Sequence, residues 1–184
     1  MILDIYCKLK NFKIIKKIDN RIVLLKSKNF NDIRGIFLKI FSNEDLKKIF
    51  NKKIIQINYV KNKKKGIIRG FHYQTGIYSE KKLIRCIKGK IEVIIIQCNK
   101  NKKDYLKPRR FILSEKNRYC LVVPENFANG YQVLENNSEL VYISDNNYNS
   151  VQEKKINPLD PKLKIKWRIK KIILSKKDKS TKYL

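Results

Sequence analysis

The chain has 184 residues, of which 42% are hydrophobic and 33% charged, so it is long enough for a single domain with a buried core over residues 1–184. This composition excludes wholesale disorder, and no run of about 20 apolar residues is present to span a membrane. Lysine and arginine number 44 against 16 acidic residues, a net charge of +28, which favours a general affinity for anions.

The first quarter of the chain predicts extended segments followed by one short helix. Residues 1–20 are rich in lysine and predict an N-terminal arm or strand, and the apolar residues 21–25 predict a short strand. A turn at 31–32 then precedes an extended segment at 34–37. A helix is expected to begin at Ser42, because acids in its first turn and later apolar residues follow at helical spacing: Glu44, Asp45, Leu46, Ile49 and Phe50.

From residue 53 onward the pattern is that of strands. Residues 53–60 alternate and place Ile55, Ile57 and Tyr59 on one face, and a charged loop follows at 61–66. Further short strands are predicted at 66–74, 83–88, 91–97, 110–113, 120–123, 130–134 and 139–144. Many short strands with one early helix predict an all-β, antiparallel sandwich or barrel. The basic segment 168–184 ends the chain, and we expect order at least to residue 174.

The charge and the cysteines favour a protein without a dedicated nucleic-acid or zinc site. Lysine, isoleucine and asparagine have AT-rich codons, and the lysines are spread without the interleaved aromatic residues of a stacking platform, so we predict no specific nucleic-acid partner. The cysteines lack C-x-x-C spacing and predict reduced thiols: Cys7, Cys86, Cys98 and Cys120. Because residues 1–11 show no signal-peptide pattern, a cytoplasmic location is expected.

His72 is the single histidine of the chain. A cupin-type metal site takes two or three histidines with a carboxylate, so we predict that any chemistry here needs no metal. Histidine suits general acid–base work because it titrates near neutral pH. Alternation places Gly70 beside His72 with space for a ligand, and places Lys82 and Arg85 on opposite faces of the next strand. These residues alone predict only a small β-barrel with a possible acid–base site.

Several motifs, in constant order from about residue 24 to residue 178, together resemble one known family. They include Ile68-Arg69-Gly70-Phe71-His72-Tyr73-Gln74, together with residues 30–37, 56–58, 82–89, 113–114, 123–130, 139–142, 160–167 and 174–178. The chain resembles the dTDP-4-dehydrorhamnose 3,5-epimerases and related nucleotide-sugar epimerases. The resemblance implies a cupin-like jelly-roll β-barrel with one or two short peripheral helices. It also implies no cofactor, and a homodimer whose nucleotide site is shared between subunits.

The resemblance also implies a substrate and a role for each matching residue. The substrate is a nucleotide-linked 4-keto-6-deoxyhexose, epimerised at carbon 3, carbon 5 or both by proton abstraction next to the ketone. His72 matches the general base, and Asp178 matches the carboxylate that orients it. Lys82 matches the cation beside the ketone oxygen, and Tyr142 the acid on the opposite face. Further matches are to substrate contacts: Arg34 and Arg69 at the diphosphate, Tyr148 stacked on the base, and Gln56, Asn58, Glu153 and Lys177.

Three positions depart from the family pattern. Asn129 stands where a second histidine is usual, and Val93 stands where its aspartate partner is usual. Because this second histidine and its aspartate are absent together, we predict one dominant reacting carbon, with carbon 3 weakly favoured. Asn129 is predicted to be a substrate contact. Lys39 replaces a glutamate that is usual at the substrate site, so the identity of the substrate's nucleotide base is not predicted. Two alternatives remain: a 3,4-ketoisomerase of the same fold, whose second histidine would fall at Gln74, and a sugar-nucleotide-binding pseudoenzyme.

Overall fold

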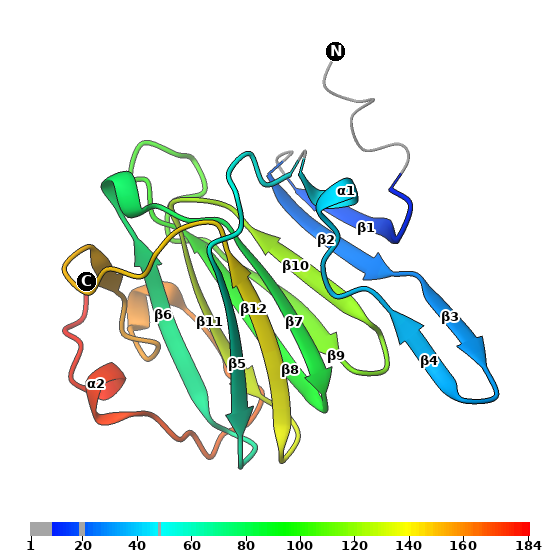
Figure 1. Cartoon of the computed structure of the whole chain (residues 1–184). Coiled ribbons are helices and arrows are strands. Elements are labelled where there is room, and N and C mark those ends of the chain that lie inside the picture. Colours follow the sequence, from blue (N-terminus) through cyan, green and yellow to red (C-terminus); the bar gives the residue numbers. More distant parts are fainter. Residues whose placement is uncertain (1–8, 19–20, 48) are drawn as a thin grey trace.

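The computed structural model describes residues 9–18, 21–47 and 49–184, and two antiparallel sheets form the body of this part of the chain (Figure 1). The larger sheet has the strand order β1 (Phe12–Ile18), β2 (Ile22–Ser27), β10 (Tyr119–Val123), β7 (Lys82–Lys88), β12 (Ser138–Ser144) and β5 (Gln56–Asn62). The smaller has the order β13 (Glu153–Lys155), β6 (Ile68–Gln74), β11 (Phe127–Val133), β8 (Lys90–Gln97) and β9 (Pro108–Ser114).

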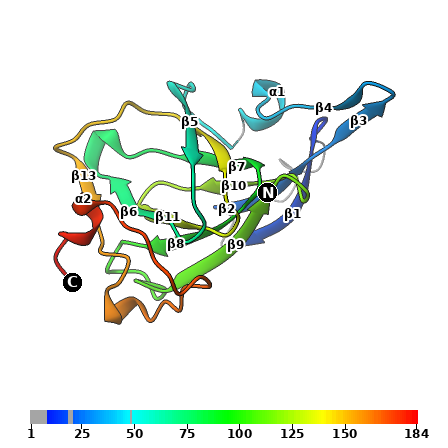
Figure 2. The ribbon, with the colours of Figure 1, turned by 90° about the horizontal axis from the view of Figure 1, so that it is seen from below.

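A hairpin and several short turns of helix complete the fold. The hairpin, β3 (Asn29–Asp32) and β4 (Gly35–Leu38), extends away from the two sheets (Figure 2). The α-helices are single turns, α1 (Asn43–Leu46) and α2 (Lys176–Lys179), and 3₁₀ turns lie at Gly76–Tyr78 and Pro161–Leu163. No helix of the described residues is long and apolar enough to cross a membrane. The architecture confirms the predicted all-β jelly-roll class with short peripheral helices.

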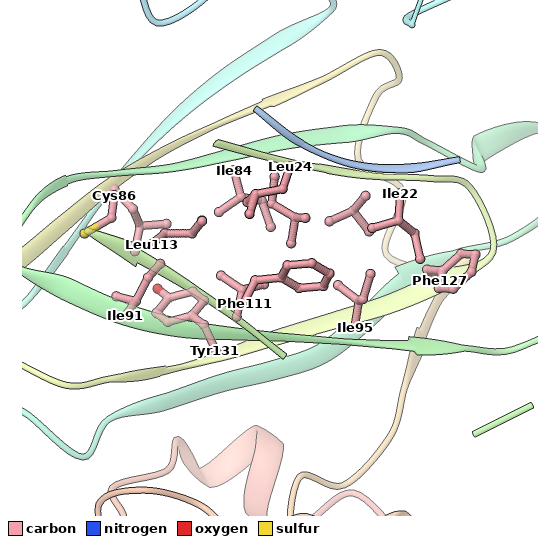
Figure 3. Packing of buried hydrophobic residues seen from close by; sticks show 14 of the residues in the cluster. Ile22, Leu24, Ile84, Cys86, Ile91, Ile95, Phe111, Leu113, Phe127 and Tyr131 are labelled. Carbon is pink, nitrogen blue, oxygen red and sulfur yellow. The ribbon is translucent and has the colours of Figure 1, made fainter. Parts of the chain in front are cut away.

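The core between the sheets follows from the two-residue period of the strands. Ile91, Val93 and Ile95 of β8 point inward and meet Ile84 and Leu24 of the larger sheet, within one buried cluster (Figure 3). The alternate β8 residues are also buried, because the chain after β13 covers the outer face of the smaller sheet. Burial on both faces explains why β8 has a nearly continuous apolar sequence.

The C-terminal segment is fastened across the outer face of the smaller sheet. Arg168 donates from Nε to Oε1 of the fully buried Glu92 at 2.8 Å, and the backbone N–H of Ile169 donates to the side-chain amide oxygen Oε1 of Gln132 at 2.9 Å. Ile173 then pairs with Ile67, which precedes β6. These contacts lead the chain back to β6 and place α2 beside it.

The differences from the predicted elements have local causes. The predicted turn at 31–32 lies within β3, and the observed turn is at Ile33 and Arg34. The predicted loop at 61–66 begins two residues late, because β5 continues through Asn62. Strand β13 was not predicted, since its three residues, Glu153–Lys155, are charged and show no apolar alternation. Strand β1 confirms a strand within residues 1–20, of which 1–8 and 19–20 lie outside the described residues.

Candidate active site

A cavity of about 560 Å³ opens between the two sheets, a size typical of small-molecule sites. Strand β6 supplies one wall, and strands β7 and β12 supply residues from the other sheet. The predicted site residues that line it are Arg69, His72, Lys82, Asn129, Tyr142, Lys177 and Asp178. The fold therefore brings together residues that are spread over more than a hundred positions of the sequence.

The imidazole of His72 lies between two carboxylates. Its Nε2 is 2.9 Å from Oδ1 of Asp178, and its Nδ1 is 3.4 Å from Oε1 of Glu153. The side chain of His72 is 31% exposed, whereas those of Asp178 and Glu153 are 6% and 10% exposed. Ser175 caps helix α2 and accepts a hydrogen bond from the backbone N–H of Asp178 at 3.0 Å. This arrangement fixes the orientation of the ring between two carboxylates.

Both carboxylates are held in their anionic form. Burial acts to raise the pKa of Asp178, but the hydrogen bond and charge of His72, together with hydrogen bonds from Ser175 and the Gly70 backbone, outweigh it and leave that pKa below its usual value. Burial likewise acts to raise the pKa of Glu153, and the opposing charges of His72, Lys177 and Lys155 lower it overall. His72 is thus placed to take up a proton between two negative groups.

Tyr142 and Lys82 face His72's strand from the opposite sheet. The Lys82 ammonium lies 6.0 Å from the centre of the Tyr142 ring and 2.8 Å from Oε1 of Glu80. Burial raises the pKa of the Tyr142 phenol, and the negative charges of Glu80 and Glu153 add to this effect against the charge of Arg69. The phenol therefore stays protonated at neutral pH and can donate a proton.

The positions that depart from the family pattern have ordinary structural roles. Asn129 is the register partner of His72, and its side-chain amide donates to the His72 carbonyl at 3.0 Å. Val93 is fully buried in the core and does not line the cavity. Gly70 lines the cavity, but a Cβ there would meet the backbone of Asn129 and Gly130 at 2.6 Å. Its glycine is thus required for close approach of β11, and not only for ligand space as the sequence suggested.

Several predicted substrate contacts do not line the cavity of this chain. Arg34 lies in the hairpin turn, where its side chain is 85% exposed and paired with Asp32, and Lys39 follows β4. Gln56 and Asn58 lie on β5, paired in register with Ser144 and Tyr142. Tyr148 is half-exposed, and its hydroxyl donates to Glu153 at 3.4 Å.

Two residues near the cavity escaped the sequence analysis. Tyr131 lines the cavity, and its hydroxyl donates to Oδ1 of Asn62, which also accepts from Arg69. Glu80 contacts Lys82 from the short segment between the 3₁₀ turn and β7. The signal for Glu80 was its two-residue spacing from Lys82, which places both side chains on one side of an extended chain. Within the described part of the chain, no group of three or more His, Cys, Asp or Glu side chains is arranged to hold a metal ion.

Comparison with known proteins identifies the family. The sequence profile described as dTDP-4-dehydrorhamnose 3,5-epimerase matches residues 17–184. The chain belongs to the dTDP-4-dehydrorhamnose 3,5-epimerase family. It is 33% identical over 159 residues to the enzyme of that name from Shigella flexneri, covering 85% of this chain and 87% of the relative. Family membership confirms the predicted class of activity, that of an isomerase that epimerises nucleotide-linked 4-keto sugars.

Solved structures of the family agree with the fold. The epimerase from Bacillus anthracis, with TDP and pyrophosphate bound, superposes with a TM-score of 0.89 at 29% identity, covering 94% of this chain and 99% of that one. The Legionella pneumophila enzyme in complex with dTDP-4-keto-L-rhamnose gives a TM-score of 0.87 at 26% identity, covering 94% and 92%. These likenesses extend over nearly the whole chain.

Proposed function

We propose that this protein epimerises a nucleotide-linked 4-keto-6-deoxyhexose, with His72 as the general base. The observation that carries the proposal is the placement of His72 and Tyr142 on facing sheets around one cavity, with a carboxylate at 2.9 Å behind the histidine. Removing a proton next to a ketone and returning one from the opposite face inverts that carbon. A base and an acid on opposite walls meet this need.

Each step can be assigned to a group of this chain. Asp178 engages Nε2 of His72, which leaves Nδ1, 3.4 Å from Oε1 of Glu153 in the free protein, as the nitrogen that takes the proton from the sugar carbon once the substrate occupies the cavity. The anionic Asp178 and Glu153 stabilise the imidazolium that forms. Lys82 donates to the ketone oxygen, where negative charge develops in the enolate. Tyr142 then returns a proton to the carbon from the other side.

The number of reacting carbons follows from the single-base cavity. With Asn129 bound to the β6 backbone and Val93 in the core, the described site has one histidine and no second imidazole–carboxylate pair. We expect one dominant reacting carbon, and carbon 3 is favoured because loss of a substrate contact should first impair the second step of a two-carbon sequence.

Solvent exchange tests the activity and identifies the carbon. The protein is incubated in deuterated water with a dTDP-linked 4-keto-6-deoxyhexose, the ligand class of the Legionella relative, and exchange at carbons 3 and 5 is followed by NMR. Exchange at either carbon, lost in His72→Gln, supports the proposal. No exchange with any 4-keto sugar nucleotide that binds would identify a sugar-nucleotide-binding protein and overturn it.

The nucleotide base is a separate question, raised by Lys39. A cation replaces the usual acid at this position, so the thymidine preference of the relatives does not transfer directly. We infer that diphosphate recognition, by Arg69 here and Arg34 in the hairpin, provides most of the binding through fork-like contacts. Competition between dTDP, UDP, GDP and CDP for the free protein, measured by calorimetry, determines the base preference.

We further propose a homodimer in which the hairpin reaches the partner. Phe30 and Phe37, a cross-strand pair of the hairpin, are 60% and 64% exposed. Ile57 and Tyr59 of the edge strand β5 are exposed as well, on the face that the sequence grouped together. Such apolar exposure on an edge and an extended hairpin is typical of an interface. A hairpin that reaches the partner would also bring Arg34, which lies outside this chain's own cavity, to the partner's active site.

The oligomeric state is tested by light scattering after size-exclusion chromatography. Wild-type protein should elute as a dimer, Phe37→Asp as a monomer, and Val151→Asp, an even more exposed apolar position elsewhere, as a dimer. A wild-type monomer would contradict the shared site.

A cytoplasmic location is proposed because the thiols of Cys86, Cys98 and Cys120 are free, which suits a reducing compartment.

A further inference from the structure

Glu80 is a buried acid that the mechanism above does not use. It lies between the 3₁₀ turn and β7, and its side chain is only 8% exposed in a chain of net charge +28. One carboxylate oxygen lies 2.8 Å from the Lys82 ammonium, and the other accepts a hydrogen bond from the Ser144 hydroxyl. Ser144 is the β12 register partner of Lys82, so the three groups form a compact set where two strands meet.

This set determines where the Lys82 ammonium lies. A lysine side chain is long and flexible, and its ammonium has three donor hydrogens. One hydrogen is directed to Glu80, and two remain for oxygen atoms in the cavity. Lys82 and Asn129 line both the main cavity and the narrow space that Glu80 also borders. The contact with Glu80 therefore holds the ammonium at the cavity wall beside Tyr142.

We propose that Glu80 is a positioning residue for the epimerisation, which holds the Lys82 ammonium in place for the negative charge that develops on the substrate's ketone oxygen. The proposal rests on the proposed function. A donor that is already oriented stabilises a developing oxyanion without reorganisation, whereas a freely rotating ammonium has to be ordered during the reaction. The effect of Glu80 should thus appear in the chemical step and not in substrate binding.

Tyr142 provides a second readout, which does not require turnover. The charged or titratable groups around its phenol are Glu80 and Glu153, Arg69, the Lys82 ammonium and Tyr131. Because the negative charge of Glu80 helps to raise the pKa of Tyr142, removing that charge should lower it. Ultraviolet difference titration of the phenol, with Tyr142→Phe as the blank, follows this ionisation in the free protein.

The decisive variant is Glu80→Gln, and its matched control is Glu125→Gln. Glu125 also pairs with a lysine, Lys52 at 2.9 Å, but it does not line the catalytic cavity. For Glu80→Gln, kcat should fall by about 10- to 100-fold, the size expected for one hydrogen bond to a charged group, with KM changed less than about 3-fold. Glu125→Gln should leave both constants unchanged. In a Lys82→Gln background, adding Glu80→Gln should change kcat by less than about 2-fold, because the effect acts through Lys82.

The outcomes separate this inference from the proposed function. Full kcat in a folded Glu80→Gln variant, with active wild type, overturns the positioning role and leaves the epimerase assignment intact. If the wild-type protein turns over no 4-keto sugar nucleotide, the proposed function fails. An unchanged pKa of the Tyr142 phenol in Glu80→Gln overturns the placement of Glu80, whatever the result for turnover. Should the glutamine variant not fold, Glu80→Asp keeps the charge but withdraws it from Lys82. Its kcat should fall at constant KM, and an unchanged kcat would again overturn the inference.

Discussion

His72 and Asn129 are register partners on neighbouring strands, yet their surroundings differ completely. The histidine side of the cavity has two nearly buried carboxylates, Asp178 and Glu153, within hydrogen-bond or ion-pair distance of the ring. On the asparagine side, the amide donates to the β6 backbone, and the core residue Val93 packs among apolar neighbours. Glu80, which borders a narrow space together with Asn129, is paired with Lys82.

From this comparison we infer that a histidine and its carboxylate stabilise each other and that neither is favourable alone at the second position. A carboxylate at position 93 without an imidazole partner would be an uncompensated charge in the apolar core, which is strongly destabilising. An amide at position 129 needs only one backbone acceptor to be satisfied. The chain therefore keeps one complete imidazole–carboxylate set and replaces the other by groups that need no charge partner.

The largest effect is expected on the histidine side. His72→Gln should lower turnover by about 10⁴-fold, the upper range for general-base catalysis, because no other described group of the cavity takes its role. Single-turnover kinetics and circular dichroism measure the rate and the fold. Asn129→Gln, on the partner strand, is the matched control and should lose less than about 10-fold. Comparable losses in both variants would mean that the two sides are functionally equivalent.

Removing the carboxylate alone should have a smaller effect. Asp178→Asn keeps the shape but loses the charge that stabilises the imidazolium, and kcat should fall by about 10²–10³-fold. The variant is checked by the pH dependence of kcat and by nucleotide affinity, which should stay near that of wild type. Near-normal activity would show that Glu153 alone is enough to support His72.

Restoring the absent pair tests the other side of the comparison. Val93→Asp combined with Asn129→His should increase deuterium exchange at the second sugar carbon by about 10-fold, below the full effect of a well-placed base. Val93→Asp alone should lose about 3–5 kcal/mol of stability because its charge is buried without a partner, and the double variant should regain part of it. If wild-type protein exchanges both carbons at similar rates, Asn129 already replaces the imidazole.

The smallest effect concerns stability in acid. Because the pKa of folded Asp178 lies below its unfolded value of about 4, its interaction with His72 stabilises the fold above that pH. This stabilisation is lost as the pH falls through the folded pKa. Urea unfolding at pH 5 and pH 3 should therefore show a smaller loss for Asp178→Asn than for wild type. An equal loss would mean that the carboxylate is not coupled to folding.

Much of the sheet architecture is visible in the sequence because strands with one buried face have alternating side chains. Segments such as β7 and β12 were predicted nearly to their ends. For β5 the shared face of Ile57 and Tyr59 was predicted, but the strand begins three residues later than expected, at Gln56, and only the structure shows that this face is exposed. The hairpin turn was misplaced by two residues, since Asn31 and Asp32 are turn-forming residues that here lie in β3. A short charged strand such as β13 has no pattern to detect.

Sequence alone determined the single histidine, its motif and the family, because these depend on residue identity and order along the chain. Only the tertiary structure decided which groups meet. Asp178 reaches His72 across 106 positions because the C-terminal segment is fastened to the outer face of the smaller sheet. Glu80 reaches Ser144 because the strand register joins β7 to β12. Such contacts depend on packing between distant segments, which local periodicity does not encode.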